Sequence, residues 1–116
     1  MADIFLYISG GLAMCVAIVH GWLGATKVVG PAATPHPSSK RILHAIMFLS
    51  AIYWFVAGGV IMTAPHVLSG EVRRWAVYAC AAMLLLGALG NLWGMRGKHF
   101  GGYALLVIAV LGFAGA

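Results

Sequence analysis

The chain has 116 residues, of which 63% are hydrophobic and only 8% are charged. Soluble domains are roughly 45–50% apolar and about 25% charged, so this composition encodes too little polar surface to cover a water-soluble globule. It excludes a soluble enzyme, a disordered tail and a disulfide-stabilised secreted scaffold, and it indicates that the apolar residues face a lipid bilayer.

The charged residues are seven basic and two acidic, and the basic ones stand in short stretches between long apolar runs. They form no clustered basic face or known motif, so nucleic acid is not an expected partner. The start, residues 1–3, lacks the positive region of a signal peptide, and we expect the first apolar run to be a retained membrane helix. Cys15 and Cys80 fall inside apolar runs, where we expect two small buried hydrophobic side chains.

Four apolar runs predict four membrane-spanning helices, because about 20 residues are needed to cross ~30 Å of hydrocarbon. In chain order we place them at about residues 4–25, 42–64, 71–94 and 99–116. Three short connections leave no room for an extramembrane domain. The expected fold is therefore all-α, a transmembrane up-down-up-down four-helix bundle that forms one domain over residues 1–116.

The breaks between the runs carry residues that stop or start helices. Four residues keep the first connection out of helix: Gly30, Pro31, Pro35 and Pro37. Ser38 or Ser39 is then the expected cap of the second helix, and Pro65 is expected to end it. Ser69, followed by Glu71, suits the start of the third helix. The last connection is the short glycine-containing turn at residues 95–99.

Basic residues are unevenly divided between the two ends of this bundle. One end has Lys27, Lys40, Arg41, Arg96 and Lys98. The other end has Arg73 and Arg74, together with Asp3, Glu71 and both termini. The positive-inside rule makes the first end cytoplasmic, so in a bacterial inner membrane both termini are expected in the periplasm.

Small residues at helical spacing indicate where helices meet. Ala13, Ala17 and Gly21 recur every four residues in the first helix, and Gly90 and Gly94 form a Gly-x-x-x-Gly pattern in the third. Such stripes allow backbones to approach closely in lipid. They predict packing within the bundle, and an alternative is a seam against a second copy or another membrane subunit.

The tryptophans divide into two groups by their depth in the predicted helices. Trp22, Trp75 and Trp93 lie near helix ends, where indole rings prefer the membrane interface. Trp54 lies in the middle of the second helix, so we expect it to pack against neighbouring helices.

Polar side chains from successive helices are expected at one depth. His20 and His44 would lie about 10 Å and 6 Å inside the basic end at 1.5 Å per residue. Asn91 falls in the same layer and His99 at its rim, and no Asp, Glu, Lys or Arg lies deep in a predicted span. Membrane-embedded polar groups of this kind suggest either structural hydrogen bonding or a functional site.

Three interpretations of this polar layer stay open. His20, His44 and Asn91 can hydrogen-bond one another or backbone carbonyls and so fix helix register. His20 and His44 can alternatively be the axial ligands of a b-type haem. A transition metal held by His20, His44 and His99 is a third alternative, although no carboxylate or thiol completes the set. The sequence contains no recognisable catalytic arrangement of Ser, Cys or carboxylate with His.

One further pattern covers most of the chain. It consists of His20-Gly21-Trp22-Leu23-Gly24, then Gly30-Pro31, Lys40-Arg41-x-x-His44 and Trp54. In these motifs the chain resembles a group of small, uncharacterised four-helix bacterial inner-membrane proteins. The resemblance implies that His20 and His44 belong to one pattern, and the chain departs from it in lacking a Trp just before His44. It implies no activity.

From these features we expect a small membrane protein without catalysis of its own. Its expected role is an accessory or structural subunit that packs against a larger membrane complex, motivated by minimal loops and small-residue seams. The alternatives are a haem-binding or electron-transfer module with His20 and His44, and a small dimeric channel or carrier. The first predicted helix lacks the membrane-embedded Glu on which small multidrug transporters depend.

Overall fold

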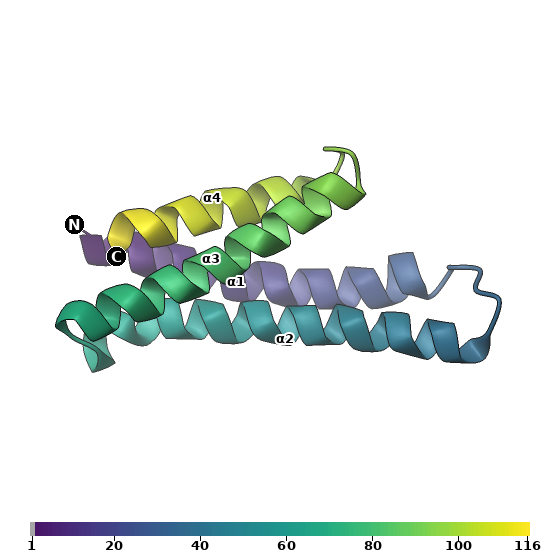
Figure 1. Ribbon diagram of the computed structural model, residues 1–116, viewed down its shortest axis with the longest axis horizontal. Coiled ribbons are helices and arrows are strands. Elements are labelled where there is room, and N and C mark those ends of the chain that lie inside the picture. The colour runs from purple at the N-terminus through teal and green to yellow at the C-terminus, as the bar shows by residue number, and fades with distance from the viewer. Residues whose placement is uncertain (1) are drawn as a thin grey trace.

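The computed structural model describes residues 2–116, and within them every regular element is a helix. In chain order these are α1 (Ala2–Leu23), a π-helical segment η1 (Gly24–Val29), α2 (Pro37–Val67), α3 (Gly70–Gly94) and α4 (Phe100–Gly115). The prediction of an all-α protein with four helices is confirmed. The fold is elongated, with extents of 51 × 25 × 18 Å (Figure 1).

Three of the helical stretches are long and apolar enough to cross a membrane: Ala2–Val29, Pro37–Val67 and Gly70–Gly94. The fourth apolar run was expected to supply a span at residues 99–116, yet α4 has 16 residues. At 1.5 Å per residue it measures about 24 Å, against ~30 Å of hydrocarbon. Since α4 is apolar throughout, its length and not its composition sets it apart.

The first two helices are longer than the sequence indicated. The first continues past residue 25 as η1, where the Gly30 N–H donates to the Ala25 carbonyl over 2.9 Å, the longer spacing of a π-helix. The Thr26 hydroxyl donates to the Trp22 carbonyl over 2.7 Å at the same place. Side-chain bonds of this kind compete with the regular helical pattern and bend helices.

Proline marks both ends of α2, and in each case the expectation was wrong. Pro37 was expected in the connection, but it is the first residue of the helix, where its missing N–H costs nothing. His36 therefore occupies the cap position, and no side chain caps the helix there, so neither Ser38 nor Ser39 has the expected role. Pro65 lies inside the last turn, and the helix ends only after Val67.

The start of α3 and the turn before α4 agree with the sequence. Ser69 is the N-cap residue of α3 and Glu71 stands in its first turn, although the Ser69 side chain makes no capping hydrogen bond. The turn at residues 95–99 contains Arg96 and Gly97 in the left-handed region, with φ of 51° and 75°.

Neighbouring helices contact one another around the fold. α1 packs against α2 and α4, and α3 packs against the same two helices. Along α1 and α2 the contacts run in opposite order, since Gly10 meets Met62 whereas Gly21 meets Ala51. Figure 1 shows both termini at one end and the α1–α2 pair extending beyond the α3–α4 turn at the other.

The core is built mainly from small side chains, which lets the helices approach closely. Each of the four long helices contributes to it: Leu6, Ala13 and Ala17; Trp54, Ala57, Ile61 and Ala64; Val77, Leu84 and Ala88; Leu105, Ile108 and Ala109. Trp54 is 6% exposed, which confirms its packing role, and its indole lies against Gly87.

The other tryptophans and the two cysteines lie elsewhere. Trp22, Trp75 and Trp93 are all exposed, as expected of side chains near a membrane interface. Cys80 is half-buried and packs against the core, whereas Cys15 is exposed. The expectation of two buried cysteines was thus wrong for Cys15. This residue lies on the exposed side of α1, opposite the side that buries Ala13 and Ala17.

Candidate functional site

The polar group of greatest interest is His20, which lies between α1 and α2. Its Nε2 is 3.3 Å from Ser50 Oγ, and the Ser50 hydroxyl donates to the Met47 carbonyl over 2.9 Å. The imidazole also packs on Trp54, with ring centroids 4.2 Å apart. Ser50 and Trp54 therefore hold the His20 ring in place between α1 and α2.

The other members of the expected polar layer have separate partners. Asn91 Nδ2 donates to the Gly87 carbonyl of its own helix over 2.8 Å. His44 is half-buried and stacks on Phe48, one turn along α2, at a centroid distance of 6.4 Å. Within residues 2–116 none of the hydrogen bonds joins His20, His44 or Asn91 to another of the three.

His99 has a defined structural role at the start of α4. Its Nδ1 accepts a hydrogen bond from the Gly102 N–H over 2.8 Å, so the side chain is the N-cap of the helix. An acceptor Nδ1 places the proton of the neutral imidazole on Nε2. Because Nδ1 is already hydrogen-bonded to the Gly102 N–H, it is not free to bind a metal ion. The sequence did not predict this capping role.

Ligand binding by these histidines finds little support in their contacts. In the part of the chain that the structure describes, no three His, Cys, Asp or Glu side chains lie together in a way that could hold a metal ion. A metal held by His20, His44 and His99 is therefore not favoured. For a b-type haem, His20 would have to use Nδ1 or break its bond to Ser50, and His44 has a different set of neighbours.

The structure places His20 and His44 at different depths along the α1–α2 pair. His20 lies level with Ser50, and Gly24, one turn further along the chain, meets Met47. His44 therefore lies closer to the connection between the two helices. The expected depths assume regular helices that end near Lys27 and Lys40, whereas α1 continues through the wider turns of η1 and α2 begins at Pro37.

A second polar cluster lies at the end of the fold that holds both termini. The sequence did not predict that its side chains contact one another. Asp3 of α1 forms an ion pair with Arg73 of α3. The Tyr7 hydroxyl and His66 Nε2 are 3.1 Å apart, which joins α1 to the end of α2. Deeper in the fold the fully buried Ser9 donates to the Ile108 carbonyl of α4 over 2.8 Å. These bonds tie α1 to all three other helices.

Both acidic residues of the described chain are engaged at this end. Glu71 pairs with Arg74 and accepts a hydrogen bond from Trp75 Nε1 over 3.1 Å. Every fully buried side-chain nitrogen or oxygen in residues 2–116 has a hydrogen-bond partner. Both carboxylates of residues 2–116 thus lie at this end of the fold, and the opposite end has basic residues without a carboxylate.

The small-residue stripes of α1 and α3 were both expected to pack within the chain, and the structure gives them different surroundings. Ala13, Ala17 and Gly21 are buried on the side of α1 that faces the other helices. Gly90 and Gly94 are exposed, and a Cβ added to either would meet nothing within 4 Å. The α3 stripe is therefore open on the surface of the fold, which leaves the alternative of a seam against a second copy or another membrane subunit.

Fold and contacts together define a class: an all-helical membrane protein with four helices, three of them able to span the bilayer. No protein-family model, curated protein or solved structure matches this chain.

Proposed function

We propose that this protein is a small four-helix integral membrane subunit that packs against a larger membrane complex. In this proposal the four helices cross the bilayer as an up-down-up-down bundle, and the protein has no catalysis of its own. The observation that carries the proposal is the open Gly90-x-x-x-Gly94 stripe on the outer side of α3.

The surroundings of this stripe support a helix-packing role. Leu86 and Trp93 lie on the same side of α3, one turn before Gly90 and one turn after it, and both are strongly exposed. Because no side chain of this protein covers Gly90 or Gly94, the backbone of a partner helix can approach α3 there, where dispersion replaces the hydrophobic drive that lipid removes. In contrast, the small residues of α1 already have partners inside the chain.

The distribution of charge supports a defined orientation. Five basic residues lie at the end of the fold where α1 meets α2 and α3 meets α4, and both acidic residues lie at the other end. Under the positive-inside rule the basic end is cytoplasmic and the termini are periplasmic in a bacterial inner membrane. The resemblance of the His20 and His44 motifs to small inner-membrane proteins agrees with this location.

The experiment is native gel electrophoresis of membranes solubilised in a mild detergent. We expect the wild-type chain to migrate with a larger complex, and Gly90→Leu to release it because the added side chain blocks the approach of a partner helix. Gly11→Leu is the matched control, since Gly11 also has open space at its Cβ but belongs to α1.

Three outcomes contradict the proposal. One is migration of the wild-type chain solely as a free monomer, and another is migration solely as a homodimer, which would make a second copy the partner. The third is retention of the Gly90→Leu variant in the complex. Far-UV circular dichroism of each purified variant verifies that the helices are intact.

A further inference from the structure

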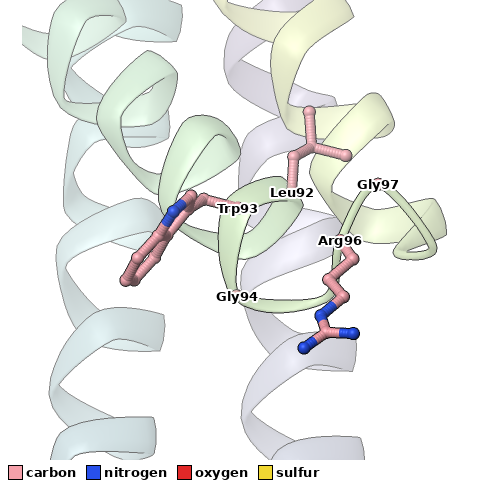
Figure 2. A pocket seen from close by; sticks show the side chains of 5 residues that line it. All are labelled: Leu92, Trp93, Gly94, Arg96 and Gly97. Atoms are coloured by element: carbon pink, nitrogen blue, oxygen red, sulfur yellow. The ribbon is translucent and has the colours of Figure 1, made fainter.

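The turn between α3 and α4 forms an open pocket at the basic end of the fold. Leu92, Trp93, Gly94, Arg96 and Gly97 line it, with a volume of about 560 Å³. Figure 2 shows the Leu92 and Arg96 side chains leaving the turn in different directions, while the Trp93 ring points away from both. The pocket is thus bordered by one cation and one large aromatic ring.

The charges around this pocket favour an anionic occupant. Arg96 and Lys98 belong to the turn itself. The other basic residues of this end, Lys27, Lys40 and Arg41, lie near the α1–α2 connection, which extends beyond the turn (Figure 1). Both acidic residues are at the opposite end, paired with Arg73 and Arg74. Within residues 2–116 the Arg96 guanidinium therefore has no carboxylate partner.

Backbone groups contribute little to anion binding here, so a side chain must supply it. The N–H groups of Arg96, Gly97 and Lys98 donate to the carbonyls of Trp93, Leu92 and Met95. The end of α3 also carries the negative pole of the helix dipole, which repels an anion. An anion in the pocket consequently depends on the Arg96 guanidinium.

Arg96 is maintained in an unfavourable backbone conformation. Its φ of 51° lies in the left-handed region, where a helix C-terminus usually has glycine. Such strain at a non-glycine residue points to a function for the side chain. Glycine would suit this position in the fold better than arginine does.

The position of the turn relative to the bilayer places the Arg96 guanidinium near the lipid headgroups. If α3 and α4 cross the bilayer as proposed above, α4 covers about 24 Å of ~30 Å of hydrocarbon. The turn joins two crossing helices, so it lies near the headgroups of one leaflet. A long arginine side chain can reach a phosphate by extending to the interface, and the exposed Trp93 ring suits that same region.

We propose that the α3–α4 turn binds the phosphate headgroup of an anionic phospholipid, with Arg96 contacting the phosphate and Lys98 adding charge. This site rests on the proposed membrane placement but not on a protein partner. It can therefore be tested on the purified chain, and loss of a complex in native gels would leave it unaffected.

The test measures lipid binding to the full chain in detergent by native mass spectrometry. Dioleoyl-phosphatidylglycerol is the probe and dioleoyl-phosphatidylcholine is the neutral comparison. We expect tighter binding of phosphatidylglycerol, and about fivefold weaker binding in Arg96→Gln, which corresponds to about 1 kcal/mol. Arg74→Gln is the matched control, because it removes the same charge from the other end, and it should bind as the wild-type chain does.

The Arg96→Gly variant distinguishes a loss of lipid binding from a loss of folding stability. It removes the guanidinium and relieves the left-handed strain, so it should bind phosphatidylglycerol weakly while its thermal midpoint without lipid equals or exceeds that of the wild type. Wild-type affinity in either Arg96 variant overturns the proposal, and so does an equal loss in Arg74→Gln. Equal binding of the two lipids, or equal thermal protection by inorganic phosphate at the same concentration, also overturns it.

Discussion

Gly10 of α1 and Gly58 of α2 meet backbone to backbone. A Cβ added to Gly10 would lie 2.5 Å from the Gly58 carbonyl oxygen, and one added to Gly58 would lie 2.8 Å from the Gly10 carbonyl oxygen. No side chain can move aside to relieve either clash, because the obstructing atoms belong to the backbone. The separation of α1 and α2 at this point is therefore set by the absence of two methyl groups.

Gly10→Ala should destabilise the protein by about 1–3 kcal/mol, the usual cost of overpacking a close contact. Gly11→Ala, one position along, meets open space, and it should be neutral or slightly stabilising because alanine is the better helix former. Unfolding of the purified protein in mixed detergent measures both. Equal stability of the two variants would show that α1 and α2 do not approach as closely as described.

His99→Ala should destabilise the start of α4, since it removes the acceptor for the Gly102 N–H. Loss of a helix N-cap costs about 0.5–2 kcal/mol. His99→Asn keeps a side-chain acceptor and should retain most of the stability. Thermal unfolding followed by circular dichroism compares the two, and an equally large loss in His99→Asn would argue against the capping role.

Asp3→Asn should weaken the attachment of α1 to α3 by up to about 1 kcal/mol, the range for partly exposed ion pairs. The Arg73 side chain is 24% exposed and that of Asp3 is 52% exposed, so water screens the pair only in part. Glu71→Gln is the comparison, because its pair with Arg74 lies within one helix and is more exposed.

We expect the effect of Asp3→Asn to exceed that of Glu71→Gln and to shrink as salt is added. Denaturation curves at low and high salt measure this. Identical curves for wild type and Asp3→Asn at low salt would contradict a stabilising ion pair.

His20→Ala should cost more stability than His44→Ala, because His20 bonds to Ser50 and packs on Trp54, whereas His44 stacks only on its own helix. Unfolding of the two purified variants in detergent shows which substitution costs more stability. The absorption spectrum of the purified protein tests the haem alternative at the same time. Under the proposed structural function we expect no Soret band, and a Soret band abolished by either substitution would establish a haem site in place of that function.

Much of the fold could be predicted because apolar run length and helix breakers are local signals. The four helices, the turn at residues 95–99 and the start of α3 near Ser69 follow from them. Proline was the exception, since its effect depends on position. A proline is compatible with the first turn of a helix, as Pro37 shows, and Pro65 lies where only two further residues of α2 follow it.

The contacts of the polar side chains were less predictable. Spacing to charged residues predicts a layer of His20, His44 and Asn91 with His99 at its rim. In the structure His20, Asn91 and His99 each have a separate hydrogen-bond partner. The partner of His20 depends on the register in which α1 packs against α2, and the helix ends do not fix that register. Counting inward from Val29 and Pro37 leads from His20 to Ile46, whereas the observed partner is Ser50. The pairs Asp3–Arg73 and Ser9–Ile108 join residues far apart in the chain, so no local pattern indicates them.

By itself the sequence determined the environment of this protein, its helices and the division of charge between its two ends, since each depends on local composition and on the cost of placing charge in hydrocarbon. Only the tertiary structure decided which small residues pack against another helix of the chain and which remain exposed on its surface. Glycines in α1 and α3 are alike as residues, but Gly10 faces a backbone and Gly90 faces nothing. That difference depends on helix register and rotation, which are set by packing among all four helices.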